Sequence, residues 1–115
     1  MLKLEGLSAG YHRLQILHEL DLRVDEGELV AIVGANGAGK TTMFNLVAGA
    51  LRPDTGRVHL GGKEITGHAP HRITAAGMTR TFQLMRPFYS MTVLENVTVA
   101  VLARPWLSVT VSFAA

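Results

Sequence analysis

The stretch that decides the fold is glycine-rich and reads Gly34-Ala35-Asn36-Gly37-Ala38-Gly39-Lys40-Thr41-Thr42. It follows the run Leu29-Val30-Ala31-Ile32-Val33, which is continuously apolar like strands that are covered on both faces. After it, apolar residues recur at helical spacing as far as Leu51, and Arg52-Pro53 ends the helix. The sequence therefore predicts an α/β fold in which strand 29–33, a glycine loop and a helix follow one another.

The glycine loop has the residue types that hold phosphate groups. From Gly34 to Thr41 it fits the pattern G-x-x-x-x-G-K-[ST]. Glycines let backbone N–H groups surround phosphate oxygens, and the helix N-terminus adds a partial positive charge. Lys40 is placed to reach the β- and γ-phosphates, Thr41 to complete a Mg²⁺ shell, and Thr42 to lie on the α-phosphate side. The expected phosphate ligands are Gly34, Asn36, Gly37, Ala38, Gly39, Lys40, Thr41 and Thr42.

Two alternatives explain the loop less well. A turn that only connects a strand to a helix would not require all four fixed positions of the pattern. A dinucleotide-binding turn needs G-x-G-x-x-G, whereas the glycines here stand at 34, 37 and 39, and Lys40 would have no role. We therefore expect a nucleoside triphosphate as the ligand, and the loop alone does not separate kinases, GTPases and transport ATPases.

The rest of the chain predicts short strands and helices around this loop. Near-alternating apolar residues indicate strands, and glycine pairs indicate turns between them. Thr92 and Glu95 stand three residues apart, which is the pattern of a capping box at a helix start. In chain order we expect strands at 2–7 and 20–24, a hairpin at 56–65, a short helix at 69–76, a strand at 79–82 and a helix at 93–103.

The composition limits the classes of function. The chain has no cysteine, which excludes disulfides and thiol catalysis. Its net charge is +2 with scattered basic residues, so no nucleic-acid partner is expected. The N-terminus lacks the apolar run of a secretory signal, which favours a cytoplasmic location. Arg104 and Pro105 interrupt the apolar stretch 97–115, which argues against a membrane span.

Two residues outside the loop carry a family resemblance. Tyr11 lies in a short loop near the N-terminus, where an aromatic ring can stack on an adenine base, and Gln83 follows the predicted strand 79–82. With them stand the segments Thr79-Arg80-Thr81-Phe82-Gln83, Arg86-Pro87-Phe88 and Met91-Thr92-Val93-Leu94-Glu95-Asn96-Val97. At these residues the chain resembles the nucleotide-binding subunits of ABC transporters, most closely the branched-chain amino-acid importer ATPases. The resemblance covers nearly the whole chain, to about Leu102. The resemblance implies a P-loop NTPase fold with an antiparallel β subdomain and the start of a parallel-sheet core.

The resemblance also implies a role for each of these residues. Tyr11 is similar to the aromatic residue that stacks on adenine in the family, with an ordinary loop tyrosine as the alternative. Gln83 is similar to the Q-loop glutamine, which helps to hold Mg²⁺ and the attacking water, with a solvated amide as the alternative. Lys40 and Gln83 are thus the expected catalytic residues, and Thr41 and Gln83 the expected Mg²⁺ ligands.

Partners follow from the same resemblance. Met85, Phe88 and Tyr89 are similar to the surface that receives the coupling helix of a membrane subunit, although packing in a core is an equal alternative. In the family, two ATP-binding subunits enclose two ATP molecules and drive a pair of permease subunits. The implied location is peripheral, on the inner face of the cell membrane.

Three motifs that complete the family's catalytic site do not occur in the sequence. These are the signature loop L-S-G-G-Q, an apolar strand ending in Asp-Glu, and a switch histidine. We therefore expect residues 1–103 to form the N-terminal part of the domain, and 104–115 to be an atypical apolar tail from truncation or a frameshift. Without the missing carboxylates the chain is expected to bind ATP more readily than it hydrolyses it. A soluble ABC-type ATPase that acts on DNA and a non-functional fragment stay open as alternatives.

Overall fold

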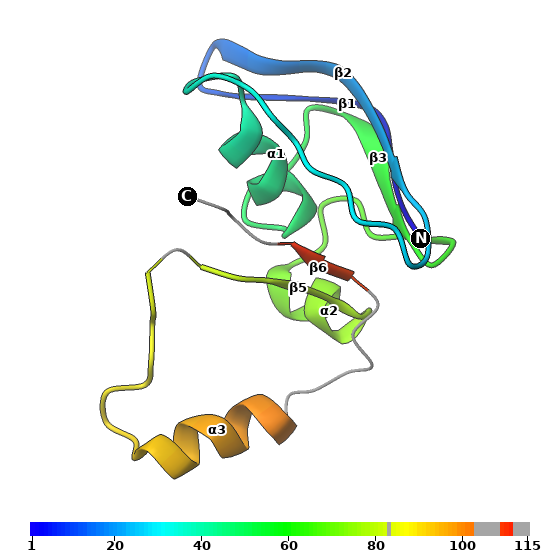
Figure 1. The fold of residues 1–115 in the computed structure, drawn as a ribbon. Helices are drawn as coiled ribbons and strands as arrows, with labels where there is room; N and C mark the ends of the chain where they lie inside the picture. Colours follow the sequence, from blue (N-terminus) through cyan, green and yellow to red (C-terminus); the bar gives the residue numbers. More distant parts are fainter. Residues whose placement is uncertain (83, 103–108, 112–115) are drawn as a thin grey trace.

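The largest unit of the fold is a four-stranded antiparallel sheet with the strand order β2-β1-β3-β4. We describe it from a computed structural model, which covers residues 1–82, 84–102 and 109–111. Figure 1 shows the two longest strands, β1 and β2, side by side, with helix α1 lying against the sheet. The strands are β1 (Leu2–Tyr11), β2 (Leu14–Val24), β3 (Thr55–Leu60) and β4 (Lys63–Glu64).

The sheet is held by apolar side chains that point to one face. Leu4 and Leu7 are almost fully buried, and they pack with Val58 of β3 and with Val47 of α1 in one cluster. The step of three from Leu4 to Leu7 is accommodated by a register shift between β1 and both of its neighbours. The strands predicted at 2–7 and 20–24 and the hairpin predicted at 56–65 are confirmed, with both N-terminal strands longer than expected.

The segment 29–33 does not form the predicted strand. It runs as irregular backbone between the turn at Gly27 and the glycine loop. Leu29 is 97% exposed and Val33 94% exposed. A parallel strand is stabilised by hydrogen bonds to its neighbours, and within the described ranges no strand pairs with this segment. The prediction of a buried central strand at this position is therefore wrong for this structure.

Two helices and a short strand follow the phosphate loop in the chain. Helix α1 (Lys40–Val47) follows the loop as predicted, but it ends at Val47 rather than at the predicted stop before Pro53, and Gly49 just beyond it has a positive φ angle of 76°. Helix α2 (Pro70–Ala75) confirms the short helix at 69–76. Strand β5 (Met78–Arg80) confirms the strand at 79–82 in shorter form, and it pairs in parallel with β6 (Val109–Val111). This two-stranded parallel sheet is separate from the antiparallel one.

Helix α3 (Val93–Leu102) confirms the predicted helix at 93–103 and its capping box. The Thr92 backbone N–H donates to Glu95 Oε2 at 2.7 Å, and the Glu95 N–H donates to Thr92 Oγ1 at 3.3 Å. None of its residues is buried, and Figure 1 shows it standing away from the sheet. In the described part of the chain no helix has the length and apolarity needed to cross a membrane.

The capping box makes the start of α3 sensitive to pH. The backbone N–H of Thr92, followed by its hydroxyl, lowers the pKa of Glu95 below the ordinary value of 4.5. A carboxyl whose pKa is lower in the folded state stabilises that state above its unfolded pKa, and the stabilisation is lost as the pH falls through the folded pKa. We therefore predict that the cap opens only below pH 4.5, as measured by NMR titration of the Glu95 carboxyl carbon. Thr92→Ala should move that pKa part of the way back, because it removes the hydroxyl donor and keeps the backbone donor.

Candidate phosphate-binding site

The glycine loop leads directly into the N-terminus of α1. Gly37 and Gly39 have positive φ angles of 85° and 87°, which glycine adopts without strain. The Ala38 N–H donates to the Ala35 carbonyl at 3.1 Å and so closes the loop into a turn. The turn leads straight into the first N–H groups of α1, which have no partner within a helix, as an anion site requires.

The loop is pressed against the sheet at Gly39. A Cβ atom at this position would lie 2.8 Å from Leu17 Cδ2 and 3.2 Å from Ile16 Cγ2, both on β2. Glycine is thus required at position 39 for two reasons, the positive φ angle and the close approach to β2. This contact fixes the start of α1 relative to the sheet.

The Lys40 side chain folds back over the loop. Its ammonium group donates to the Gly34 carbonyl and, at 2.7 Å, to the Ala35 carbonyl. The positive charge is therefore held above the same backbone that would surround a phosphate. An ammonium group has three donors and can exchange these carbonyl partners for phosphate oxygens without moving far.

The two threonines of the loop differ in exposure. Thr41 is exposed at the first turn of α1, whereas Thr42 is only 6% exposed. A hydroxyl oxygen is the hard donor type that Mg²⁺ prefers, so the position of Thr41 fits a Mg²⁺ ligand beside a bound phosphate. The described residues contain no cluster of three or more His, Cys, Asp or Glu side chains that could hold a metal by themselves.

Tyr11 stands at the end of β1, where it is joined to the loop's helix. Its side chain is 43% exposed, and its hydroxyl accepts a hydrogen bond from Asn45 Nδ2 at 3.2 Å. Asn45 Oδ1 in turn accepts from Arg80 Nη1 of β5 at 2.6 Å. No spacing pattern in the sequence connects Tyr11, Asn45 and Arg80, because they lie 34 and 35 positions apart.

Gln83 lies outside the described residues, so its predicted roles stay predictions. On its N-terminal side Phe82 is 61% exposed, with the Arg80 guanidinium carbon 5.6 Å from its ring centre. On its C-terminal side the residues expected to meet a membrane subunit are exposed rather than packed in a core. They are Met85, Phe88 and Tyr89.

Asn96 of α3 shapes the segment that carries these exposed residues. Its Oδ1 accepts from the Phe88 N–H at 2.9 Å, and its Nδ2 donates to the carbonyls of Phe88, Met91 and Thr92. The turn 88–92 is therefore fixed to the start of α3, and it presents Tyr89 to solvent.

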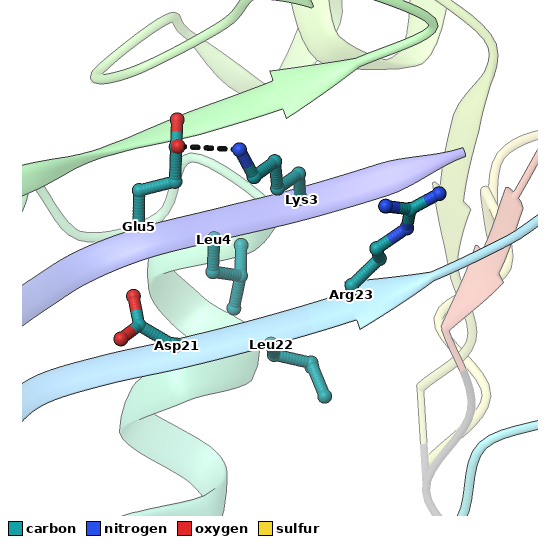
Figure 2. Close-up of a pocket in the computed structure, with 6 residues that line it drawn as sticks. All are labelled: Lys3, Leu4, Glu5, Asp21, Leu22 and Arg23. Carbon is teal, nitrogen blue, oxygen red and sulfur yellow. Dashed lines mark hydrogen bonds and ion pairs between the residues drawn. The ribbon is translucent and has the colours of Figure 1, made fainter.

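A shallow pocket of about 330 Å³ on the sheet is separate from the phosphate loop, since all of its lining residues belong to β1 and β2. Figure 2 shows Lys3 and Glu5 on one side of β1, joined by an ion pair, with Leu4 pointing to the other side. The hydrogen bond from Lys3 lowers the pKa of Glu5. The pocket therefore contains a partly exposed surface ion pair, and no residue of the candidate site lines it.

Comparison with known proteins defines the class of this site. A family model described as ABC transporter matches residues 17–114, and the chain therefore belongs to that family. Among curated relatives, it is 41% identical over 100 residues to the probable branched-chain amino acid transport ATP-binding protein LivG of Archaeoglobus fulgidus. It is also 41% identical over 100 residues to the high-affinity branched-chain amino acid transport ATP-binding protein BraF of Pseudomonas aeruginosa. Both matches cover 87% of this chain and 39% of the relative, so the chain spans about two fifths of their length.

Solved structures give the same class. A nucleotide-free ATP-binding cassette from an ABC transporter superposes with a TM-score of 0.76 and 35% identity, covering 86% of this chain and 39% of that one. An ATP-binding cassette in its ADP conformation gives a TM-score of 0.77 and 35% identity, with 88% and 40% covered. The predicted family, its fold and the likeness to branched-chain amino-acid transport ATPases are confirmed.

Proposed function

We propose that this chain provides the ATP-binding half-site of a transporter that imports branched-chain amino acids. The observation that carries the proposal is the Lys40 ammonium group, held over a glycine loop at the N-terminus of α1. The relatives from two organisms are branched-chain amino acid transport ATP-binding proteins, which supports branched-chain amino acids as the class of transported substrate. The phosphate loop supplies the ligand class by its own chemistry.

Each predicted site residue has a part in this proposal. The backbone of residues 34–39 and the Lys40 side chain hold the triphosphate, and Tyr11 stacks on the adenine. Thr41 and Gln83 hold Mg²⁺, which when bound shares the negative charge of the phosphates. Lys40 and Gln83 are the residues through which the chain contributes to catalysis, the first by charge and the second by orienting water.

The partners proposed are a second ATP-binding subunit and the permease subunits of the transporter. The exposed side chains of Met85, Phe88 and Tyr89 support a docking surface for a permease, because they cluster within one short segment next to Gln83. Through that surface the chain would sit on the inner face of the cell membrane. Binding of ATP is the activity we propose for this chain, because the phosphate loop is the part of the site that the sequence contains.

The test is a titration of the purified chain with a fluorescent ATP analogue in the presence of Mg²⁺. We predict saturable binding that unlabelled ATP displaces, and that weakens when Mg²⁺ is removed because Thr41 then has no ion to share with the phosphates. Absence of saturable binding would contradict the proposal. Salt-sensitive binding to duplex DNA in a parallel titration would favour instead an ABC-type ATPase that acts on DNA.

A further inference from the structure

Asn45 connects the two sides of the nucleotide site through its side-chain amide. It lies on α1, five residues after Lys40, and it is partly buried. The amide bonds the Tyr11 hydroxyl at the end of β1 and the Arg80 guanidinium of β5. One side chain therefore ties the last residue of β1 to the helix that begins at the phosphate loop.

The chemistry of the partners fixes which way the amide points. An arginine side chain only donates hydrogen bonds, so Asn45 must turn its Oδ1 toward Arg80. The bond from Arg80 Nη1 to that oxygen is 2.6 Å, which is short because the donor is charged. The Nδ2 group is then left facing Tyr11, and it donates to the Tyr11 hydroxyl at 3.2 Å. Arg80 thus fixes the orientation of the Asn45 amide, and the amide in turn fixes the position of the Tyr11 hydroxyl.

This arrangement places the ring at a defined distance from the phosphates. Asn45 and Lys40 belong to one helix and are about 7.5 Å apart along its axis at 1.5 Å per residue. In any one bound conformation a nucleotide has a defined distance from its base to its phosphates. We propose that Asn45 is a positioning residue, which holds the Tyr11 ring where the base of the nucleotide meets it. The inference rests on the proposed function, because it takes Tyr11 as the residue that stacks on the base.

The test compares ATP with inorganic tripolyphosphate, which has the phosphates and no base. Both are titrated with Mg²⁺ into the full chain and its Asn45→Leu variant, which keeps the volume of the side chain and removes both hydrogen bonds. We expect the variant to bind ATP about 3- to 10-fold more weakly, the effect of one lost hydrogen bond and a freed side chain. Tripolyphosphate affinity should change less than about 2-fold, since its contacts do not include Tyr11.

Two further variants separate positioning from a general structural role. Asn45→Asp keeps an acceptor for Arg80, and its carboxylate can accept from the Tyr11 hydroxyl. The ratio of the ATP affinity to the tripolyphosphate affinity should therefore return toward that of the natural chain. Tyr11→Phe keeps the ring and removes the hydroxyl, so it should lower that ratio as Asn45→Leu does. The double variant Tyr11→Phe, Asn45→Leu should then lose no more than either single variant.

The outcomes also distinguish this inference from the proposed function. If the natural chain binds ATP and Asn45→Leu weakens ATP and tripolyphosphate equally, or neither of them, the positioning role is overturned while the proposed function stands. A thermal melt of each variant shows whether an equal loss of both affinities in Asn45→Leu comes from unfolding. If it does, the ratio of ATP affinity to tripolyphosphate affinity in Asn45→Asp and Tyr11→Phe decides whether Asn45 positions Tyr11. If the natural chain binds neither ligand, both the proposed function and the inference fail.

Discussion

Replacing Lys40 by alanine is expected to weaken ATP binding by about 30- to 150-fold. The lysine would donate charged hydrogen bonds to the β- and γ-phosphates, and loss of such contacts costs about 2–3 kcal/mol. In the structure its ammonium group already lies over the loop, bonded to the carbonyls of Gly34 and Ala35. The lysine is therefore close to the position that phosphate binding requires. The measurement is the dissociation constant of the fluorescent ATP analogue for both proteins.

A matched control separates a local contact from a general effect of charge. Lys63 is exposed on the hairpin between β3 and β4, and Lys63→Ala removes the same charge away from the loop. It should change the affinity less than about 2-fold, because exposed charges beyond about 10 Å are largely screened. Equal losses in Lys40→Ala and Lys63→Ala would contradict the phosphate-binding role of Lys40. The thermal melt of Lys40→Ala should stay close to that of the natural chain, since both of its hydrogen bonds are exposed.

Features that depend on neighbouring residues were predicted correctly from the sequence. The capping box is recognised from Thr92 and Glu95, which are three residues apart, and the side chain of each accepts a hydrogen bond from the backbone N–H of the other. The glycine loop is likewise local, since its turn is made by Ala35, Ala38 and two glycines with positive φ. In both cases the stabilising hydrogen bonds join residues close in the chain, so a short pattern contains all the information.

Two features that depend on distant partners, the segment 29–33 and the contacts of Asn45, were predicted wrongly or missed. The apolar run 29–33 indicates a preference for burial, but a run cannot show which strands will cover it. The part of the chain that the structure describes places no strand beside it, and Leu29 and Val33 remain exposed. Asn45 was missed for the same physical reason, because its two partners come from β1 and β5 and no periodicity marks them. Long-range pairing, rather than local propensity, limits the prediction of this site.

Replacing Gly56 by alanine is expected to destabilise the sheet strongly. Two residues of β1, Gly6 and Leu7, lie opposite this single residue of β3, since Glu5 pairs with Arg57 and Ser8 with Thr55. A Cβ atom on Gly56 would lie 2.4 Å from the Gly6 carbonyl oxygen and 2.6 Å from the Glu5 carbonyl oxygen. Both atoms are backbone, so no side-chain rotation relieves the overlap. With φ at 91°, the strain of about 1–2 kcal/mol adds to about 1–3 kcal/mol for overpacking.

Gly62→Ala is the matched control for this prediction. Gly62 has a similar φ angle of 80°, but a Cβ atom there would have no heavy atom within 4 Å. It should therefore show only the conformational cost of about 1–2 kcal/mol in urea unfolding. The difference between the two variants then measures the overlap with β1 alone. Equal destabilisation would show that β1 moves away freely at Gly6.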